Sequence, residues 1–466
     1  MTVDLLVTGA QIVTEDSTFR GSVAVSAGKI VEVISGDATI DAANVIDATG
    51  KVILPGLVDG HVHFNQPGRD HWEGYRTGSM AAAAGGVTTV VDMPLNASPP
   101  TTSVERLARK RDVVQSESIV DYAQWGGLVD DNVRQLPGLF AAGVVGCKAF
   151  MSSSGTDFER VDDDLLHAGL EAGAEARSLI SVHAEDENAT ALLGQRLRDA
   201  GRTDRASWSE SRPPSAELDA IRRAIECARS AHGNLHVVHV SIAAGLEEIA
   251  RARREGVSVT AETCPHYLFF DQSDFERIGP GAKCAPPLRS RDEVDALWDA
   301  VLDGLVDTIG SDHSPCLWED KAKGIEDVWQ AWGGISGLQT MLPALLTAGR
   351  PRGLTLPALV RMTATSPARL FGLYPRKGAI APGADADLVV VDPDRQWTLS
   401  ADQLLYRNRH SAYVGCTFTG AVERTLVRGE TVYLDGSITV QPGFGRLLRR
   451  NSPSTPLERR AQAGPS

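Results

Sequence analysis

The sequence predicts an α/β protein whose main part is a TIM-type (β/α)8 barrel, flanked by a β-sandwich built from both chain ends. Three observations lead to this prediction. Apolar strand-like runs alternate with helical stretches through the middle of the chain. Short β-type runs, separated by Gly and Asp, open the chain and return near its end. Histidines, a lysine and an aspartate fall where the middle runs end.

The middle of the chain contains eight apolar runs, and helical candidates such as residues 103–115, 215–231 and 245–255 lie between them. Nearly continuous apolar runs are typical of buried parallel strands. Eight units of strand followed by helix specify a closed parallel barrel. The runs are residues 57–64, 88–93, 121–128, 144–150, 179–183, 235–240, 257–262 and 307–311.

The domain division follows from these patterns. We expect residues 1–55 and 376–440 to pair into the β-sandwich and residues 56–375 to form the barrel. Residues 441–466 are expected to be a frayed tail, because Ser, Pro and Gly accompany its arginines. These arginines are Arg446, Arg449, Arg450, Arg459 and Arg460.

Composition narrows the function classes. The formal net charge of -14 argues against a nucleic-acid partner. The six cysteines are scattered without a Cys-x-x-Cys pair, which favours a reducing compartment. The chain opens without the basic start and apolar run of a signal peptide, and no apolar run reaches the roughly 18 residues of a membrane span. We therefore expect a cytoplasmic protein with no membrane partner.

The ends of the predicted strands carry metal-ligand residue types. His61 and His63 share one face of the first strand because side chains alternate along a strand. Two neutral imidazoles on one face suit zinc, although an isolated His-x-His also fits a half-buried strand. Active residues of such barrels lie at the carboxyl ends of the strands. Further strand ends add Lys148, His183, His239 and Asp312, so the sequence predicts a metal site at the barrel mouth.

Other polar residues lie close to these strand ends. His236 is three residues before His239, so we expect it to face the surrounding helices. His266 and His313 could orient a ligand. Six loop residues are candidates for holding a substrate, with ordinary loop structure as the alternative. They are Asn65, Asn96, Ser153, Cys284, Pro286 and Trp332.

Motifs along nearly the whole chain resemble those of cyclic amidohydrolases, the branch of the amidohydrolase superfamily that holds dihydroorotases, hydantoinases, dihydropyrimidinases and allantoinases. The finer resemblance is to the allantoinases, through residues 67–75, 92–96 and 331–339. The motifs that carry the broader resemblance are Asp-Gly-His-Val-His at 59–63, Gly-Gly-Val-Thr-Thr at 85–89, Lys148, His-Ala-Glu at 183–185, His-Val-Ser at 239–241, residues 262–268 and Ser-Asp-His-Ser-Pro at 311–315.

Two positions separate the branches. Dihydroorotases of similar sequence place an arginine at the position of Asn65, where it holds the substrate carboxylate. Hydantoinases usually have a tyrosine five residues after the bridging lysine, where this chain has Ser153. Both positions favour the allantoinase resemblance.

The resemblance implies a two-metal site. His61, His63 and Asp312 would hold one divalent cation, and His183 and His239 the second. Lys148, carrying CO2 as a carbamate, would bridge them together with a hydroxide. Zinc suits these ligands best, while cobalt, manganese, nickel or iron stay open.

The implied reaction is hydrolysis of the cyclic amide of allantoin to allantoate in purine catabolism, with Asp312 transferring the proton, in a homotetramer. A hydantoinase or dihydropyrimidinase-type cyclic amidase is the alternative. A non-catalytic scaffold relative would lack metal ligands, whereas all six stand here.

Overall fold

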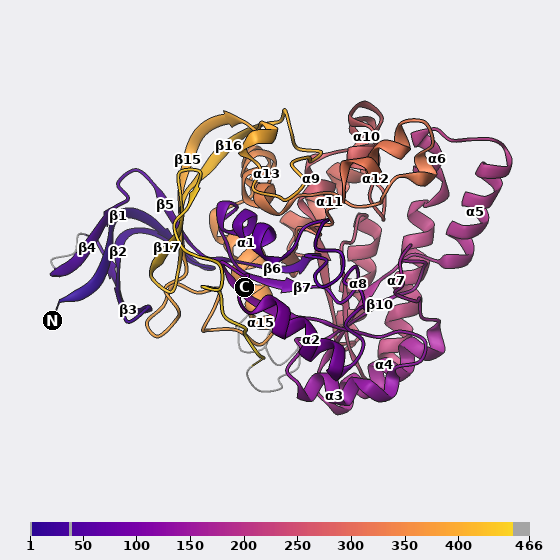
Figure 1. The fold of residues 1–466 in the computed structure, drawn as a ribbon, viewed down its shortest axis with the longest axis horizontal. Helices are drawn as coiled ribbons and strands as arrows, with labels where there is room; N and C mark the ends of the chain where they lie inside the picture. Colours follow the sequence, from indigo (N-terminus) through magenta and orange to yellow (C-terminus); the bar gives the residue numbers. More distant parts are fainter. Residues whose placement is uncertain (1, 37–39, 451–466) are drawn as a thin grey trace.

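The computed structural model describes residues 2–36 and 40–450, and it has two regions. A β sheet built from both ends of the chain lies at one end of the molecule, and a barrel surrounded by helices makes up the rest (Figure 1). In Figure 1 the indigo and yellow segments of the sheet lie side by side, because β5 (Val52–Pro55) pairs with β15 (Leu388–Thr398).

The barrel strands are parallel and buried along their length. Trp125 interrupts the third of them and donates its indole N–H to Gly60 O at 3.0 Å. The bridge from Val62 to His313 brings the last segment back beside the first strand. The strands are β6 (Leu57–Val62), β7 (Val87–Asp92), β8 (Asp121–Gln124) with β9 (Gly126–Gly127), β10 (Cys147–Phe150), β11 (Leu179–His183), β12 (Asn234–Val237), β13 (Val259–Thr263) and β14 (Thr308–Ile309).

Several helices between the strands begin at a side-chain cap. Ser103, Asp162 and Asp186 each accept a backbone N–H at a helix start. The helices are α1 (Tyr75–Ala84), α2 (Val104–Val114), α3 (Leu136–Ala141), α4 (Asp163–Glu175), α5 (Glu187–Asp199), α6 (Arg205–Ser211), α7 (Pro214–Ser230), α8 (Ala243–Arg254), α9 (Pro265–Phe269), α10 (Gln272–Ile278), α11 (Arg291–Leu302), α12 (Trp318–Ala322), α13 (Met341–Gly349), α14 (Leu356–Val360) and α15 (Ser366–Leu370).

The second region is one continuous sheet of nine strands, which confirms that both chain ends join in one β module. Its core is made of small and branched apolar residues such as Val7, Ile12 and Val23. The remaining strands are β1 (Val3–Val13), β2 (Thr18–Ser26), β3 (Lys29–Ser35), β4 (Ala42–Asp47), β16 (Thr417–Val427), β17 (Glu430–Leu434) and β18 (Ser437–Ile438).

A buried ionic cluster joins the two regions. Lys377 Nζ lies 2.6 Å from Asp121 on the barrel and 2.7 Å from Asp387 beside the sheet. The residues after 440 also dock here, since Arg446 N donates to Asp121 at 2.8 Å and Leu448 is buried. The expectation of a frayed tail is therefore wrong for residues 441–450, because their backbone hydrogen bonds are made with the barrel. Arg459 and Arg460 lie outside the described residues.

Two further observations bear on the sequence predictions. All six cysteines are free thiols. Within residues 2–36 and 40–450, none of the helices combines the length and apolar content needed to cross a bilayer.

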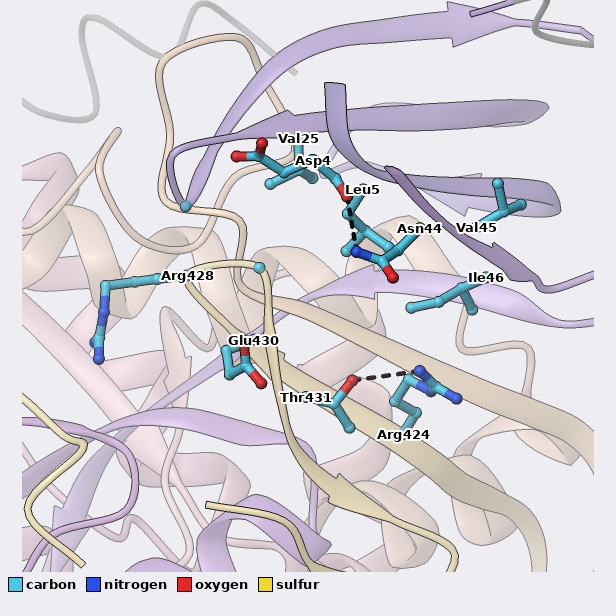
Figure 2. A pocket seen from close by; sticks show the side chains of 12 residues that line it. Asp4, Leu5, Val25, Asn44, Val45, Ile46, Arg424, Arg428, Glu430 and Thr431 are labelled. Atoms are coloured by element: carbon cyan, nitrogen blue, oxygen red, sulfur yellow. Dashed lines mark hydrogen bonds between the residues drawn. The ribbon is translucent and has the colours of Figure 1, made fainter. Parts of the chain in front are cut away.

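A hollow of about 460 Å³ lies between β1, β4 and the β16–β17 hairpin. Figure 2 shows its polar lining, where Arg424 donates to Thr431 Oγ1 at 3.3 Å and the Asn44 amide donates to Asp4 O at 3.2 Å. None of the predicted site residues lines this hollow. The candidate site must therefore be sought at the barrel mouth.

Candidate functional site

The six predicted ligands sit at the carboxyl ends of five barrel strands, and all are buried. The strand order brings them to the same end of the barrel because parallel strands all end on one side. His61 lies in β6, Lys148 in β10 and His183 at the end of β11. His239 and Asp312 come two and three residues after β12 and β14.

The first group consists of His61, His63 and Asp312, whose ligand atoms all lie within 4.8 Å of one another. Asp312 Oδ1 is 3.2 Å from His61 Nε2 and 3.4 Å from His63 Nε2. Burial raises the pKa of Asp312, but the two histidines outweigh it and hold that pKa below its ordinary value. On the far side of the ring, His61 Nδ1 lies 2.7 Å from Glu262 Oε1. This contact leaves Nε2 directed at Asp312.

The second group consists of His183 and His239. His183 Nδ1 lies 3.0 Å from His239 Nε2, and His183 Nε2 lies 2.8 Å from Glu185 Oε2. Burial lowers the pKa of both imidazoles, so their neutral forms, which carry a free lone pair, are favoured. The His239 and His61 ring centroids are 5.4 Å apart. The two groups are therefore neighbours in one site.

Lys148 is completely buried and its Nζ has no hydrogen-bond partner among the described residues. Burial lowers the pKa of its ammonium group to about 7, which makes a neutral amine accessible near neutral pH. An unpartnered buried amine costs free energy unless something else satisfies it. Together with four imidazoles and a carboxylate, this orphaned amine fits a site for divalent cations.

Four residues among the candidate ligands and substrate contacts have strained backbone conformations. Asn65, Asn96, His239 and Asp312 all have left-handed backbone conformations, with φ between 42° and 66°. Residues other than glycine adopt this region at a cost of about 1–3 kcal/mol each, and such residues cluster at functional sites. No periodicity in the sequence indicates these conformations.

The predicted substrate residues do not all occupy equivalent places. Asn65 and Asn96 are buried, and the side-chain Oδ1 of each has no partner among the described residues. Trp332 also has an indole N–H without a described partner, and its ring contacts Trp72 at 4.7 Å. Ser153 is exposed, with its backbone N–H donated to Glu187.

Cys284 and Pro286 are buried beside the site, but their backbone carbonyls already have donors. Trp208 Nε1 donates to Cys284 O, and the Tyr267 hydroxyl donates to Pro286 O, both at 2.8 Å. Since a carbonyl oxygen has two lone pairs, each of these carbonyls can accept one further hydrogen bond.

The expectation that His236 faces the helices is wrong. His236 Nδ1 contacts Thr260 Oγ1 at 2.9 Å, and its Nε2 lies 3.8 Å from Glu262. Glu262 in turn contacts His61, so His236 lies on the side of the sheet that carries the ligands. The alternation fails because β12 ends at Val237 and His239 adopts a left-handed conformation.

Two further histidines and two glutamates lie next to the candidate ligands. His266 is buried, its Nε2 has no described partner, and burial lowers its pKa to about 4. His313 is buried between Phe64 and Tyr406. The sequence predicts Glu185 in a solvated loop, with bracing of the rim as the alternative, but the residue is fully buried and contacts His183. Glu262, which the sequence offers only as part of a motif, contacts His61.

The chain belongs to the amidohydrolase family, whose sequence profile matches residues 52–432. Within this family it is similar to allantoinases along its whole length. The allantoinase of Rubrobacter xylanophilus is 46% identical over 96% of this chain and 97% of its own length. The allantoinase of Solibacter usitatus is 44% identical over 96% of this chain and 97% of its own length. The allantoinase of Deinococcus radiodurans is 42% identical over 97% of this chain and 100% of its own length.

Solved structures of the same family share the fold. The L-hydantoinase (dihydropyrimidinase) from Arthrobacter aurescens matches with a TM-score of 0.94 at 37% identity, covering 96% of this chain and all of its own. The dihydropyrimidinase from Brevibacillus agri matches with a TM-score of 0.88 at 32% identity, covering 96% of this chain and 98% of its own. The predictions of a cyclic amidohydrolase and of its α/β barrel fold are confirmed.

Proposed function

We propose that the protein is an allantoinase, a metal-dependent hydrolase that opens the cyclic amide of allantoin to give allantoate in purine catabolism. One observation carries this proposal: the buried cluster of His61, His63 and Asp312 lies within 4.8 Å at the barrel mouth. Its support is the full-length similarity to proteins named allantoinase, at 42–46% identity.

Two divalent cations would be held by the two groups of ligands. His61, His63 and Asp312 would bind one cation and His183 and His239 the other, with Lys148 between them as a carbamate. Zinc suits these donors best, and cobalt, manganese, nickel or iron can replace it. When bound, such a pair polarises the scissile carbonyl and lowers the pKa of a water molecule so that hydroxide forms near neutral pH.

Lys148 can become a carbamate because burial lowers the pKa of its amine to about 7, so a large fraction of the side chain is neutral near that pH. The Nζ lone pair attacks the carbon of CO2, a new N–C bond forms, and one Nζ proton is released. One C=O π bond of CO2 opens as the N–C bond forms, so the neutral amine becomes an anionic group with two oxygen atoms. This change supplies the anionic bridge that an ammonium group would oppose.

Asp312 is the proposed catalytic residue. Its carboxylate is kept deprotonated beside His61 and His63, so it can accept the proton of the attacking water. It then returns that proton to the ring nitrogen as the C–N bond breaks, and allantoate leaves. General acid–base transfer of this kind typically contributes 10²–10⁴-fold.

Substrate contacts are assigned to the loops around the mouth. The unpartnered Oδ1 atoms of Asn65 and Asn96 can each accept an N–H of the hydantoin ring or of the ureido group. The Trp332 indole N–H can donate to a substrate carbonyl. Ser153, Cys284 and Pro286 complete the proposed lining.

A hydantoinase or dihydropyrimidinase-type cyclic amidase is the second candidate, because the solved structures that match are hydantoinases and dihydropyrimidinases. The test is the initial rate of the purified enzyme on racemic allantoin, hydantoin, dihydrouracil and dihydroorotate. We expect allantoin to give the highest kcat/KM. A preference for plain hydantoin would replace the proposal with its alternative.

The proposal includes the state of the protein in the cell. We assign it to the cytoplasm, since its cysteines are free and scattered, and to a homotetramer, as the family resemblance implies. Sedimentation velocity of the purified protein tests the tetramer, and a monomer at micromolar concentration would contradict it.

A further inference from the structure

The second group of ligands is supported by a buried chain of charged side chains that begins at Glu185. His183 Nε2 lies 2.8 Å from Glu185 Oε2, and Arg212 donates to the same oxygen. Glu185 is fully buried. The guanidinium group therefore replaces the water that a carboxylate would otherwise bind. Arg212 directly follows α6, so this support comes from outside the barrel strands.

The chain continues from Arg212 to the strand end that carries His239. Arg289 NH1 donates to Arg212 O at 2.5 Å, and its Nε donates to Ser241 Oγ at 2.9 Å. Arg289 NH2 donates to Glu217 Oε2 at 2.8 Å, and Glu217 Oε1 accepts the Ser241 backbone N–H at 2.8 Å. Two charged side chains thus hold the residue that lies two positions after His239.

These contacts determine which atom of His183 is free. A carboxylate accepts hydrogen bonds and donates none, so Glu185 fixes the proton of the imidazole on Nε2. The lone pair is then on Nδ1, which is the atom 3.0 Å from His239 Nε2. Holding the tautomer and the ring orientation in this way raises the affinity of an imidazole for a metal.

The first group of ligands has a different kind of support. His61 Nδ1 contacts Glu262, which is part of strand β13. Among the described residues, the ion pairs of Glu262 are made with His61 and His236, and no arginine or lysine pairs with it. A change at Arg212 should therefore leave the first group untouched.

We propose that Arg212 and Arg289 are positioning residues that set the affinity of the second cation site separately from the first. Arg212 holds Glu185 against His183, and Arg289 holds the segment that follows His239. The inference rests on the two-cation function proposed above. Its consequence is that loss of the Arg212 guanidinium releases one cation and retains the other.

The test counts metal on the full chain. Zinc-loaded enzyme, kept in bicarbonate, is dialysed against increasing chelator, and the zinc retained per chain is measured by inductively coupled plasma mass spectrometry. Wild type is expected to hold two equivalents. Arg212→Gln is expected to lose one equivalent at a roughly 10–100-fold lower chelator concentration and to keep the other as wild type does. Arg212→Lys, which keeps the positive charge, is expected to fall between them.

The matched control is Arg223→Gln. Arg223 on α7 pairs with Asp186, the neighbour of Glu185, without contacting Glu185 itself. We expect this variant to retain both equivalents. If Arg223→Gln loses zinc as Arg212→Gln does, or if Arg212→Gln releases both equivalents together, the support acts through general stability and the inference is overturned.

Two further outcomes separate this inference from the proposal on which it rests. Two equivalents held equally by wild type and Arg212→Gln would overturn the inference alone. A wild-type chain that binds a single equivalent would overturn the two-cation proposal with it. Should circular dichroism show that Arg212→Gln is unfolded, Ser241→Ala, which removes one contact of Arg289, must show the same selective loss in smaller degree, and wild-type zinc retention by Ser241→Ala would then overturn the inference.

Discussion

The two groups of candidate ligands are supported by different parts of the molecule. His61 and Asp312 are held by carboxylates of the barrel strands, since Asp59 Oδ1 accepts the backbone N–H of both His61 and Ser311. His183 and the His239 segment depend on Arg212, which directly follows α6, and on Arg289, which lies just before α11. Assembly of the parallel strands therefore completes the first group, whereas the second also needs the surrounding helices and loops.

The largest effect is expected from Lys148→Ala, which removes the proposed protein bridge between the two groups. Without an anion there, the cations repel each other and several kcal/mol of transition-state stabilisation are lost, which corresponds to a roughly 10³-fold or larger fall in kcat/KM. Assay of allantoin hydrolysis with zinc analysis measures both losses. A short-chain carboxylic acid should restore part of the activity. A variant that keeps two zinc ions without added acid would contradict the carbamate.

Asp312→Asn should lower kcat by about 10²–10⁴-fold, because an amide neither accepts the proton nor returns it to the leaving nitrogen. The substitution also lowers the affinity of the first group for its cation. Steady-state kinetics must therefore be run at saturating zinc, with the metal content checked. Near-wild-type turnover in a fully loaded Asp312→Asn enzyme would remove this residue from the proton transfer.

Glu262→Gln tests the support of the first group, as Arg212→Gln tests that of the second. The amide can donate to His61 Nδ1, so it no longer requires the tautomer whose lone pair is on Nε2. We expect the affinity of the first group for its cation to fall roughly 10–100-fold and the affinity of the second group to stay unchanged. This is the reverse of the pattern expected for Arg212→Gln. Chelator dialysis of both variants side by side measures this, and an identical release profile for the two would erase the distinction between the groups.

The meeting of the candidate ligands at one barrel mouth could be predicted because it follows from strand periodicity and barrel topology. His61 and His63 share a face by alternation, and the parallel strands bring Lys148, His183 and Asp312 to the same mouth. The same rule failed for His236, because it assumes a regular strand and β12 ends at Val237.

The supports could not be predicted, since they depend on packing between segments distant in the chain. Arg212 lies 27 residues from Glu185, and Arg289 lies 48 residues from Ser241. No motif links these positions. The packing of the last residues before 450 on Tyr122 was missed for the same reason, as Leu448 N donates to Tyr122 O at 2.7 Å across a long stretch of sequence.

The most direct test of the central claim is anomalous X-ray diffraction from crystals of the zinc-loaded enzyme. The proposal predicts two zinc peaks about 3.5–4 Å apart, one contacting His61, His63 and Asp312 and the other His183 and His239. Electron density should extend from Lys148 Nζ between them. A single peak, or peaks bound elsewhere, would contradict the two-cation site.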